Sequence, residues 1–351
     1  MYFRKKIVLA NFILAVSVMF LHSHNIVHYP ATEHTFLPGL EFLISKTVGN
    51  LAVPGFFLIS SYLFYRNYGK DKILRKYRSR FWSVLVPYWL WNALYYLVFL
   101  ALVAFPVSRY FMDTMQVEWS VHELAQAVLN HKYHGAYWFM QQLAWFVVLS
   151  PVIWVLMKKR WGIILPAVLL GWNYAEIHFP VEEFGLRLDM LVYWCVGCYL
   201  ALHGAEKFEA RATTGKYYYG MLFFVLLGIR FWLEFSKGMN VYNSRLAAVL
   251  LFMNVLVLWP ALDILECRNV RWWMEITFFI YSTHPLLTDT VKKGMAKLLP
   301  NTLVFGLINY FATVGISLCV IIAVAKLLMN HMPFVWKILN GGRGVAKADG
   351  A

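Results

Sequence analysis

The feature that most constrains this chain is the recurrence of long apolar stretches along its whole length. A helix that crosses a bilayer needs about 20 predominantly apolar residues, because no water in the hydrocarbon core satisfies its backbone polar groups. Ten such stretches occur, at approximately 7–24, 48–65, 82–104, 136–157, 161–178, 186–203, 217–235, 245–264, 273–290 and 302–328. The sequence therefore predicts an all-α fold, a polytopic membrane helix bundle of about ten transmembrane helices.

The composition supports a membrane protein and argues against a nucleic-acid-binding one. Of the 351 residues, 60% are hydrophobic and 14% are charged, and the mean hydropathy is +0.56. Soluble domains carry about 25% charged residues. The net charge of +14 comes from basic residues that lie in short clusters between the apolar stretches. This arrangement is typical of membrane topology, so we expect contacts with membrane lipids and none with nucleic acid.

The basic clusters also predict the orientation of the bundle. Ten alternating spans with an inside N-terminus place most of the 32 lysines and arginines on one side, including Arg4, Lys5, Lys6 and the seven of residues 66–80. Positive segments stay in the cytoplasm, so both termini are expected there. We expect residues 1–330 to form one membrane domain and residues 331–351 to form a short, disordered cytoplasmic tail.

Ionisable side chains at the ends of spans are candidates for function, since they are costly in hydrocarbon. His22 and His24 close the first span, and on a helix their side chains lie roughly 200° apart, so only one of them can face the bundle interior. An imidazole titrates near neutral pH and can take a proton from a hydroxyl group. The alternative is that both histidines are interfacial and wetted by lipid headgroups.

The basic segment after the second span contains the second candidate site. The segment contains three arginines, Arg75, Arg78 and Arg80. Arginines three residues apart lie on one face of a helix, where they can bind phosphates through several donors. Such a cluster can hold the phosphates of a coenzyme or an anionic lipid. It can equally serve as a topology anchor on the positive side of the membrane.

Other polar residues lie within predicted spans. Gln141 and Gln142, beside Trp138, can hydrogen-bond another helix or contact a substrate. His284 precedes a proline and suits either a structural or a catalytic role. Glu33 is one of several outer acids able to orient a histidine. Cys195 and Cys198 are spaced like metal ligands, but the sequence has no second close pair of cysteines. A structural zinc site needs four ligands, so we expect no metal site.

Taken in order along the chain, these stretches resemble the acyltransferase 3 family of bacterial membrane proteins. The resemblance rests on the first span ending in His22, on Phe-Phe-Leu-Ile-Ser at 56–60, and on the basic segment running into 80–88. It continues through Trp138-Phe139 with Ser150-Pro151 and through Ile-Tyr-Ser-Thr-His-Pro at 280–285. The segment 87–92 is most similar to sugar O-acetylases of the fucose 4-O-acetylase-like group.

The resemblance implies a ten-helix enzyme of the bacterial cell (inner) membrane. Such an enzyme transfers an acyl group, usually acetyl, from cytoplasmic acyl-CoA to a hydroxyl of a cell-surface or lipid-linked glycan. Acetyl-CoA is then a co-substrate, and no tightly bound cofactor is expected. The family's key histidine falls on His22 and its coenzyme-side arginines fall on Arg75, Arg78 and Arg80. His24, Glu33 and His284 are second-choice residues for orienting His22.

Two departures from the family pattern leave alternatives open. Asn11 stands where members commonly have arginine, and Gln141 and Gln142 stand where many have an arginine and an acid. These changes imply a different donor or acceptor, or a catalytically weakened paralogue. A transporter or flippase for a glycan or lipid intermediate is the alternative from another functional class.

Overall fold

The computed structural model describes residues 2–25, 36–105, 117–175, 185–236, 241–266 and 270–344. Within these ranges the regular structure is helical and contains no strand, which confirms the predicted all-α membrane bundle. The first half contains α1 (Tyr2–Ser23), α2 (Phe36–Phe42), α3 (Ala52–Tyr65), α4 (Ile73–Arg80), α5 (Val86–Ala104), α6 (Val121–Asn130), α7 (Trp138–Val148), α8 (Ser150–Met157) and α9 (Ile164–Tyr174). The second half contains α11 (Leu188–His203), α12 (Ala205–Glu209), α13 (Lys216–Phe231), α14 (Val241–Ala261), α15 (Thr277–Leu298), α16 (Leu303–His331) and α17 (Pro333–Leu339).

Short π and 3₁₀ segments join many of these helices, so that the chain seldom leaves a helical path. They are η2 (Leu43–Val48), η3 (Gly49–Leu51), η4 (Lys70–Lys72), η5 (Phe81–Leu85), η7 (Gly135–Tyr137), η8 (Arg160–Ile163), η9 (Trp232–Ser236), η10 (Leu262–Leu265) and η11 (Trp272–Met274). A continuous helical path keeps backbone N–H and C=O groups bonded within the segment, as hydrocarbon requires.

Six helical segments of the described residues are long and apolar enough to cross a bilayer: Tyr2–Ser23, Phe36–Tyr65, Lys70–Ala104, Lys216–Phe235, Arg245–Leu265 and Leu303–His331. Gly135–Val148 and Ser150–Met157 together make a seventh, bent by 62°. Arg160–Trp172 and Leu188–His203 are shorter apolar helices. Helix α15 overlaps the ninth predicted stretch, so each of the ten stretches contains a helix. The count of ten crossings and the cytoplasmic position of the termini stay predictions.

Helix α15 begins and ends later than the stretch predicted at 273–290. It continues through a charged end with Asp289, Lys292, Lys293 and Lys297. Lys293 Nζ lies 2.9 Å from an Asp289 carboxylate oxygen. The helix extends beyond its apolar part because these charges pair with one another and with backbone carbonyls of α1.

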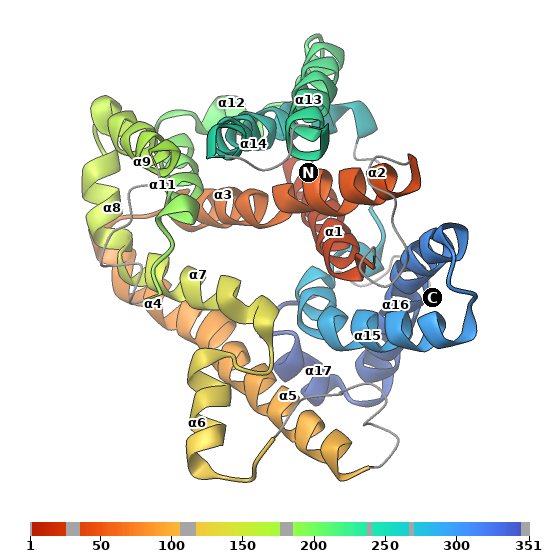
Figure 1. Ribbon diagram of the computed structural model, residues 1–351. Coiled ribbons are helices and arrows are strands. Elements are labelled where there is room, and N and C mark those ends of the chain that lie inside the picture. Colours follow the sequence, from red (N-terminus) through yellow and green to blue (C-terminus); the bar gives the residue numbers. More distant parts are fainter. Residues whose placement is uncertain are drawn as a thin grey trace.

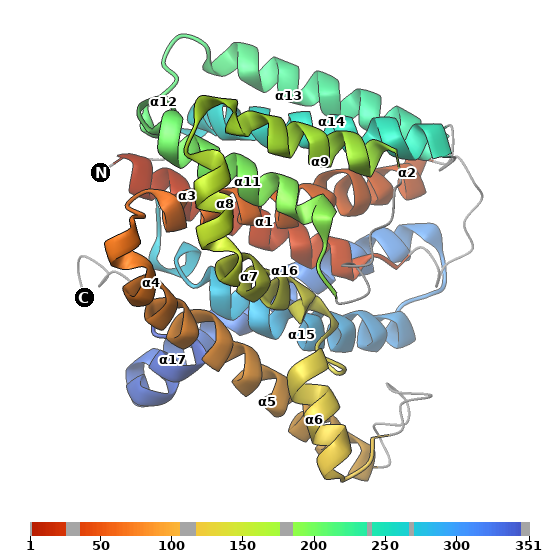
Figure 2. The same ribbon diagram turned by 90° about the vertical axis from the view of Figure 1, so that its left-hand side faces the viewer.

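Helix α1 occupies the centre of the bundle (Figure 1), where it contacts α3, α15 and α16. The pair α13 and α14 covers one side, and α4, α5 and α6 lie on the other. Figure 2 shows that α5 runs diagonally away from the centre and that α6 packs beside its far end. Helix α1 therefore packs against α15, a helix far from it in the sequence.

Helices α3 and α11 pack closely at Gly197. A Cβ atom at this position would overlap the backbone carbonyl of Leu58 and lie 2.7 Å from Ser61 Cβ and 3.0 Å from Tyr62 N. Ser61 Oγ also donates a hydrogen bond to the carbonyl of Trp194 on α11. Small residues allow membrane helices to approach this closely, so Gly197 sets the spacing of the two helices.

Contacts at the start of α1 show that α1 and α3 run antiparallel. The guanidinium of Arg66, directly after α3, lies 5.3 Å from the ring centroid of Phe3. One turn further along α1, Lys6 Nζ lies 2.7 Å from a carboxylate oxygen of Asp263, and both side chains are almost fully buried. The arginines of α4 follow directly after this junction, so they lie at the end of α1 that is opposite to His22.

The segment after residue 330 was predicted to be a disordered tail, and part of it is helical instead. Residues 333–339 form helix α17, and Trp336 is buried against Phe279 with ring centroids 5.2 Å apart. Trp91 Nε1 also donates a hydrogen bond of 2.9 Å to the carbonyl of Leu339. Aromatic packing of this kind orders a short helix that its own sequence does not stabilise. Residues 345–351 lie outside the described residues.

Candidate active site

His22 ends α1 with its side chain exposed to a cavity of about 280 Å³. The last turns of α5, Tyr133 and the second half of α15 form the rest of the wall. Asp289 and Lys292 provide the charged groups of this wall, and Tyr95 and Tyr133 provide hydroxyls. The cavity is thus polar at one side and offers room beside an imidazole for a small part of a substrate.

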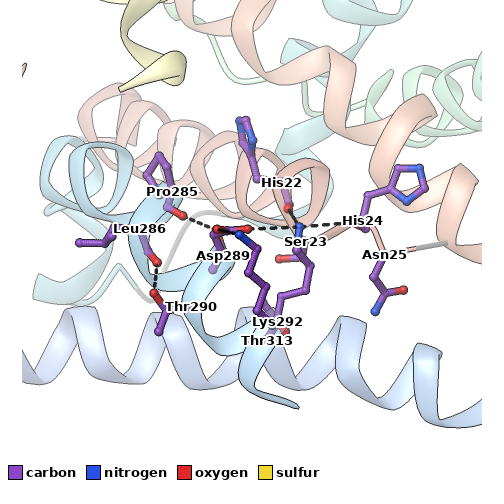
Figure 3. Close-up of polar contacts among 12 residues, drawn as sticks. His22, Ser23, His24, Asn25, Pro285, Leu286, Asp289, Thr290, Lys292 and Thr313 are labelled. Atoms are coloured by element: carbon purple, nitrogen blue, oxygen red, sulfur yellow. Dashed lines mark hydrogen bonds and ion pairs between the residues drawn. The ribbon is translucent and has the colours of Figure 1, made fainter. Parts of the chain in front are cut away.

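Lys292 fixes the end of α1 that carries this imidazole. Its Nζ donates to the carbonyl of His22 at 3.1 Å and to that of His24 at 3.5 Å, and lies 4.0 Å from Asp289 (Figure 3). The last carbonyls of a helix have no partner within the helix, and a cation there is favourable. The sequence reasoning did not select Lys292, because this contact joins residues on two distant helices.

His284 lies next to His22, with ring centroids 5.2 Å apart. It is fully buried, and its Nδ1 lies 2.8 Å from the carbonyl of Tyr281. A carbonyl only accepts, so Nδ1 carries the proton and Nε2 carries the lone pair. Nε2 is buried and has no hydrogen-bond partner among the described residues. An unpaired acceptor beside His22 can receive a proton or orient the reacting groups.

His134 is a third histidine of this region, and the sequence reasoning missed it. Its Nε2 lies 3.0 Å from the carbonyl of Ser282, so Nε2 donates. Its Nδ1 is buried and unpartnered among the described residues. The ring lies between Tyr95 and Tyr137, at centroid distances of 3.9 and 3.7 Å. Its place two residues before the fourth predicted span was the only available signal.

Burial lowers the pKa of His134 to about 3, because the charged imidazolium loses its hydration. The ring is therefore neutral at physiological pH. Tyr95 donates to the Ser282 carbonyl at 3.0 Å, and Tyr137 donates to Ser282 Oγ at 2.7 Å. Ser282 therefore accepts hydrogen bonds from His134, Tyr95 and Tyr137 and holds the three rings together.

His24 does not join the cavity, and its side chain points away from that of His22 (Figure 3). His24 Nδ1 lies 2.9 Å from Glu41 Oε1, which also accepts the backbone N–H of Asn25 at 2.6 Å. The role proposed for His24 in orienting His22 therefore has no geometric support. Glu33, the acid selected from the sequence to orient His22, lies outside the described residues.

The three selected arginines lie on α4, at the opposite end of α1 from His22. Arg78 and Arg80 line an apolar groove of about 740 Å³ between α4, η5 and α7, whereas Arg75 is exposed outside it. Gln141 lines the same groove. Helix α1 has 22 residues and is therefore about 33 Å long, and α4 follows the end of α3 that contacts the first turn of α1. The arginines and His22 thus lie near different ends of α1.

The comparisons with known proteins decide the family. The model of the acyltransferase 3 family, an acyltransferase domain, matches residues 7–326. The chain belongs to the acyltransferase 3 family. No curated protein and no solved structure matches the chain. The protein is therefore a multi-pass membrane acyltransferase, and the resemblance inferred from the motifs is confirmed.

The positions at which this acyltransferase departs from the family pattern have separate environments. Gln142 is buried and donates to the carbonyl of Gly185, while its Oε1 accepts the N–H of Arg187 at 2.9 Å. The Arg187 guanidinium stacks 4.6 Å from the ring centroid of Trp138. Gln142 and Trp138 therefore hold the chain before α11, which is a packing role.

Asn11 lies on α1, roughly three turns before His22 and on the same helical face. Gln141 faces the groove that Arg78 and Arg80 line. Gln141 therefore lies beside two of the selected arginines, and Asn11 lies on the helix that carries His22.

Proposed function

We propose that this acyltransferase moves an acyl group, usually acetyl, from cytoplasmic acyl-CoA to a hydroxyl of a cell-surface or lipid-linked glycan. The proposal rests on one arrangement: His22 borders a polar cavity at one end of α1, and an arginine-lined apolar groove lies at the other. An enzyme with this division receives its donor on one side and its acceptor on the other. The bacterial cell membrane is the expected location.

The donor side suits acyl-CoA by its chemistry. Guanidinium groups bind phosphate through paired, charge-assisted hydrogen bonds. Arg78 and Arg80 lie beside the largely apolar walls formed by Tyr77, Val84 and Trp145. The arginines would hold the phosphates of the coenzyme, and the apolar walls would cover the less polar arm that carries the thioester. Arg75, exposed beside them, would add to the attraction of the anion.

His22 would act as general base or would carry the acyl group itself. As a base, its imidazole takes the proton of the acceptor hydroxyl while that oxygen attacks the thioester carbonyl. The carbon–sulfur bond then breaks, and the thiolate of CoA receives the proton from the imidazolium. In the covalent route the imidazole nitrogen attacks the thioester carbonyl first, and the carbon–sulfur bond breaks to release the CoA thiolate. The acceptor hydroxyl then attacks the acyl-imidazole and displaces the imidazole, and its proton goes to the thiolate. Both routes produce one ester and one free thiol.

Mass spectrometry of ester-linked acyl groups on surface glycans tests this proposal. Cells would carry the wild-type gene, no gene, His22→Gln or His24→Gln, at equal membrane expression. His24→Gln is the matched control, since His24 pairs with Glu41 outside the cavity. We expect the ester to disappear without the gene and in His22→Gln, and to persist in His24→Gln.

Two outcomes would contradict the proposal. Full acylation in His22→Gln would remove His22 from the reaction. A fall in glycan abundance with unchanged acylation would favour a transporter or flippase of a glycan intermediate instead.

A further inference from the structure

The segment that follows the acyltransferase domain returns to the donor side of the bundle. The family model ends at residue 326, while α17 continues the chain to Leu339 and packs against α5. Trp336 and the Leu339 carbonyl anchor α17 through Phe279 and Trp91. Helix α17 therefore delivers residues 340–344 to the start of α5, next to the arginines of α4.

A tight turn after α17 directs Arg343 back into the protein. Gly341 and Gly342 have φ values of +62° and +69°, which side chains other than glycine rarely tolerate. A Cβ atom on Gly341 would collide with Arg343 Nη1 and lie 3.0 Å from Pro87 Cγ. Asn340 Nδ2 closes the turn by donating to the Arg343 carbonyl at 2.8 Å. The turn thus directs a partly buried guanidinium toward η5.

The guanidinium of Arg343 is held by neutral groups alone. Its Nη2 donates to the carbonyl of Ser83 at 2.9 Å and its Nη1 to that of Asn340 at 3.3 Å, with Cζ 3.9 Å from the ring centroid of Phe278. Among the described residues no carboxylate pairs with it. Burial and the positive charge of Arg80 lower the pKa of Arg343 to about 10.

Arg80, the last residue of α4, also lies against an aromatic ring without a carboxylate partner among the described residues. Its guanidinium lies 5.4 Å from the ring centroid of Phe64, and within the described ranges it forms no ion pair. Two guanidinium groups that repel each other, without an acid, destabilise this region unless an anion lies between them or beside them. Each guanidinium lies against an aromatic ring.

We propose that Arg343 and Arg80 together bind a phosphate of the acyl donor, so that the segment beyond the acyltransferase domain completes the donor site. This inference rests on the proposed use of acyl-CoA. Arg80 lines the apolar groove, and Ser83, which accepts from Arg343, lies one turn further along the same helical path. A phosphate held here leaves the acyl arm pointing along Val84 toward Gln141. Phosphate from a lipid headgroup has the same chemistry, and the test separates the two sources.

The test compares binding of two donors to the full-length protein in phosphatidylcholine nanodiscs, which carry no anionic lipid. Acetyl-CoA has phosphates, and acetyl-pantetheine has the same thioester arm without them. The variants are Arg343→Gln and Arg343→Lys, with Lys337→Gln as control, since Lys337 is an exposed cation on α17. Thermal unfolding of each variant shows that it is folded.

We expect Arg343→Gln to weaken acetyl-CoA binding about tenfold and to leave acetyl-pantetheine binding unchanged. Arg343→Lys keeps the charge and loses the paired donors, so its effect is smaller, and Lys337→Gln binds as wild type. Equal loss for both donors means that Arg343 is structural, and an unchanged acetyl-CoA affinity also overturns the inference.

Two further results separate this inference from binding of a lipid phosphate and from failure of the proposed function. If the difference between wild type and Arg343→Gln appears only after phosphatidylglycerol is added to the nanodiscs, the bound phosphate is that of a lipid, and the donor assignment is wrong. If the wild-type protein binds neither donor, the proposed function fails, whatever Arg343 does.

Discussion

The imidazole rings of His22 and His284 lie with their centroids 5.2 Å apart, although 262 positions of the chain separate the two residues. His284 presents a buried Nε2 lone pair, since its Nδ1 is committed to the Tyr281 carbonyl. His22 borders the cavity. The pair therefore places an exposed imidazole beside a buried one that has a free acceptor nitrogen among the described residues, and neighbouring imidazoles can transfer protons.

Replacement of His284 by glutamine should lower the rate of acyl transfer about a hundredfold, because the reacting imidazole loses its neighbouring acceptor. Acetyl-CoA binding should not change, since His284 does not line the arginine-lined groove proposed for the donor. Initial rates in isolated membranes measure the effect. His203→Gln is the control: His203 is exposed at the end of α11 and bonds to the Met157 carbonyl at 2.9 Å. A His284→Gln variant as active as this control would limit His284 to packing.

Removal of the Lys292 ammonium should loosen the end of α1 and displace His22. We expect Lys292→Met to lower the free energy of unfolding by about 1 to 2 kcal/mol, since two helix-end carbonyls lose a charged donor, and to reduce transfer more than tenfold. Lys293→Met is the matched variant, because Lys293 pairs with the same Asp289 on the exposed side and such pairs contribute about 0 to 1 kcal/mol. Thermal unfolding in detergent and transfer rates would be measured together. Equal effects of the two substitutions would argue against a specific role for Lys292.

Acid should destabilise the protein partly through His134. The unfolded chain binds a proton on this residue near pH 6.5, whereas burial lowers the folded pKa to about 3. Stability is therefore lost as pH falls below 6.5, by at most about 1.4 kcal/mol per pH unit. In His134→Phe this contribution is absent, and Tyr95 still donates to the Ser282 carbonyl. Unfolding midpoints between pH 7 and pH 4.5 should fall less steeply in the variant, and parallel curves would contradict the assignment.

Gly197→Ala should separate α3 from α11. The added Cβ would overlap backbone atoms of α3, and overpacking of this kind costs about 1 to 3 kcal/mol. Gly315→Ala on α16 is the control, since nothing lies within 4 Å of its Cβ position and alanine favours a helix. We expect a lower unfolding midpoint for the first variant and an unchanged or higher one for the second. Equal midpoints would mean that the two helices adjust without cost.

The sequence alone determined the helical membrane architecture and the divergence of His22 from His24. Both follow from local rules: apolar stretches of membrane length must form helices, and residues two apart on a helix point to different sides. The same local reasoning placed Arg75, Arg78 and Arg80 on one short helix. It also selected His22 as the imidazole of greatest interest, a role that stays a prediction.

Only the tertiary structure decided which distant residues meet. Lys292 caps the helix that ends in His22, His134 shares the Ser282 carbonyl with Tyr95, and Arg343 returns to Ser83. No periodicity links these positions, because each contact depends on how whole helices pack. The ordered helix α17 has the same origin: a seven-residue segment is not stable as an isolated helix, and it becomes ordered when Trp336 is buried against Phe279.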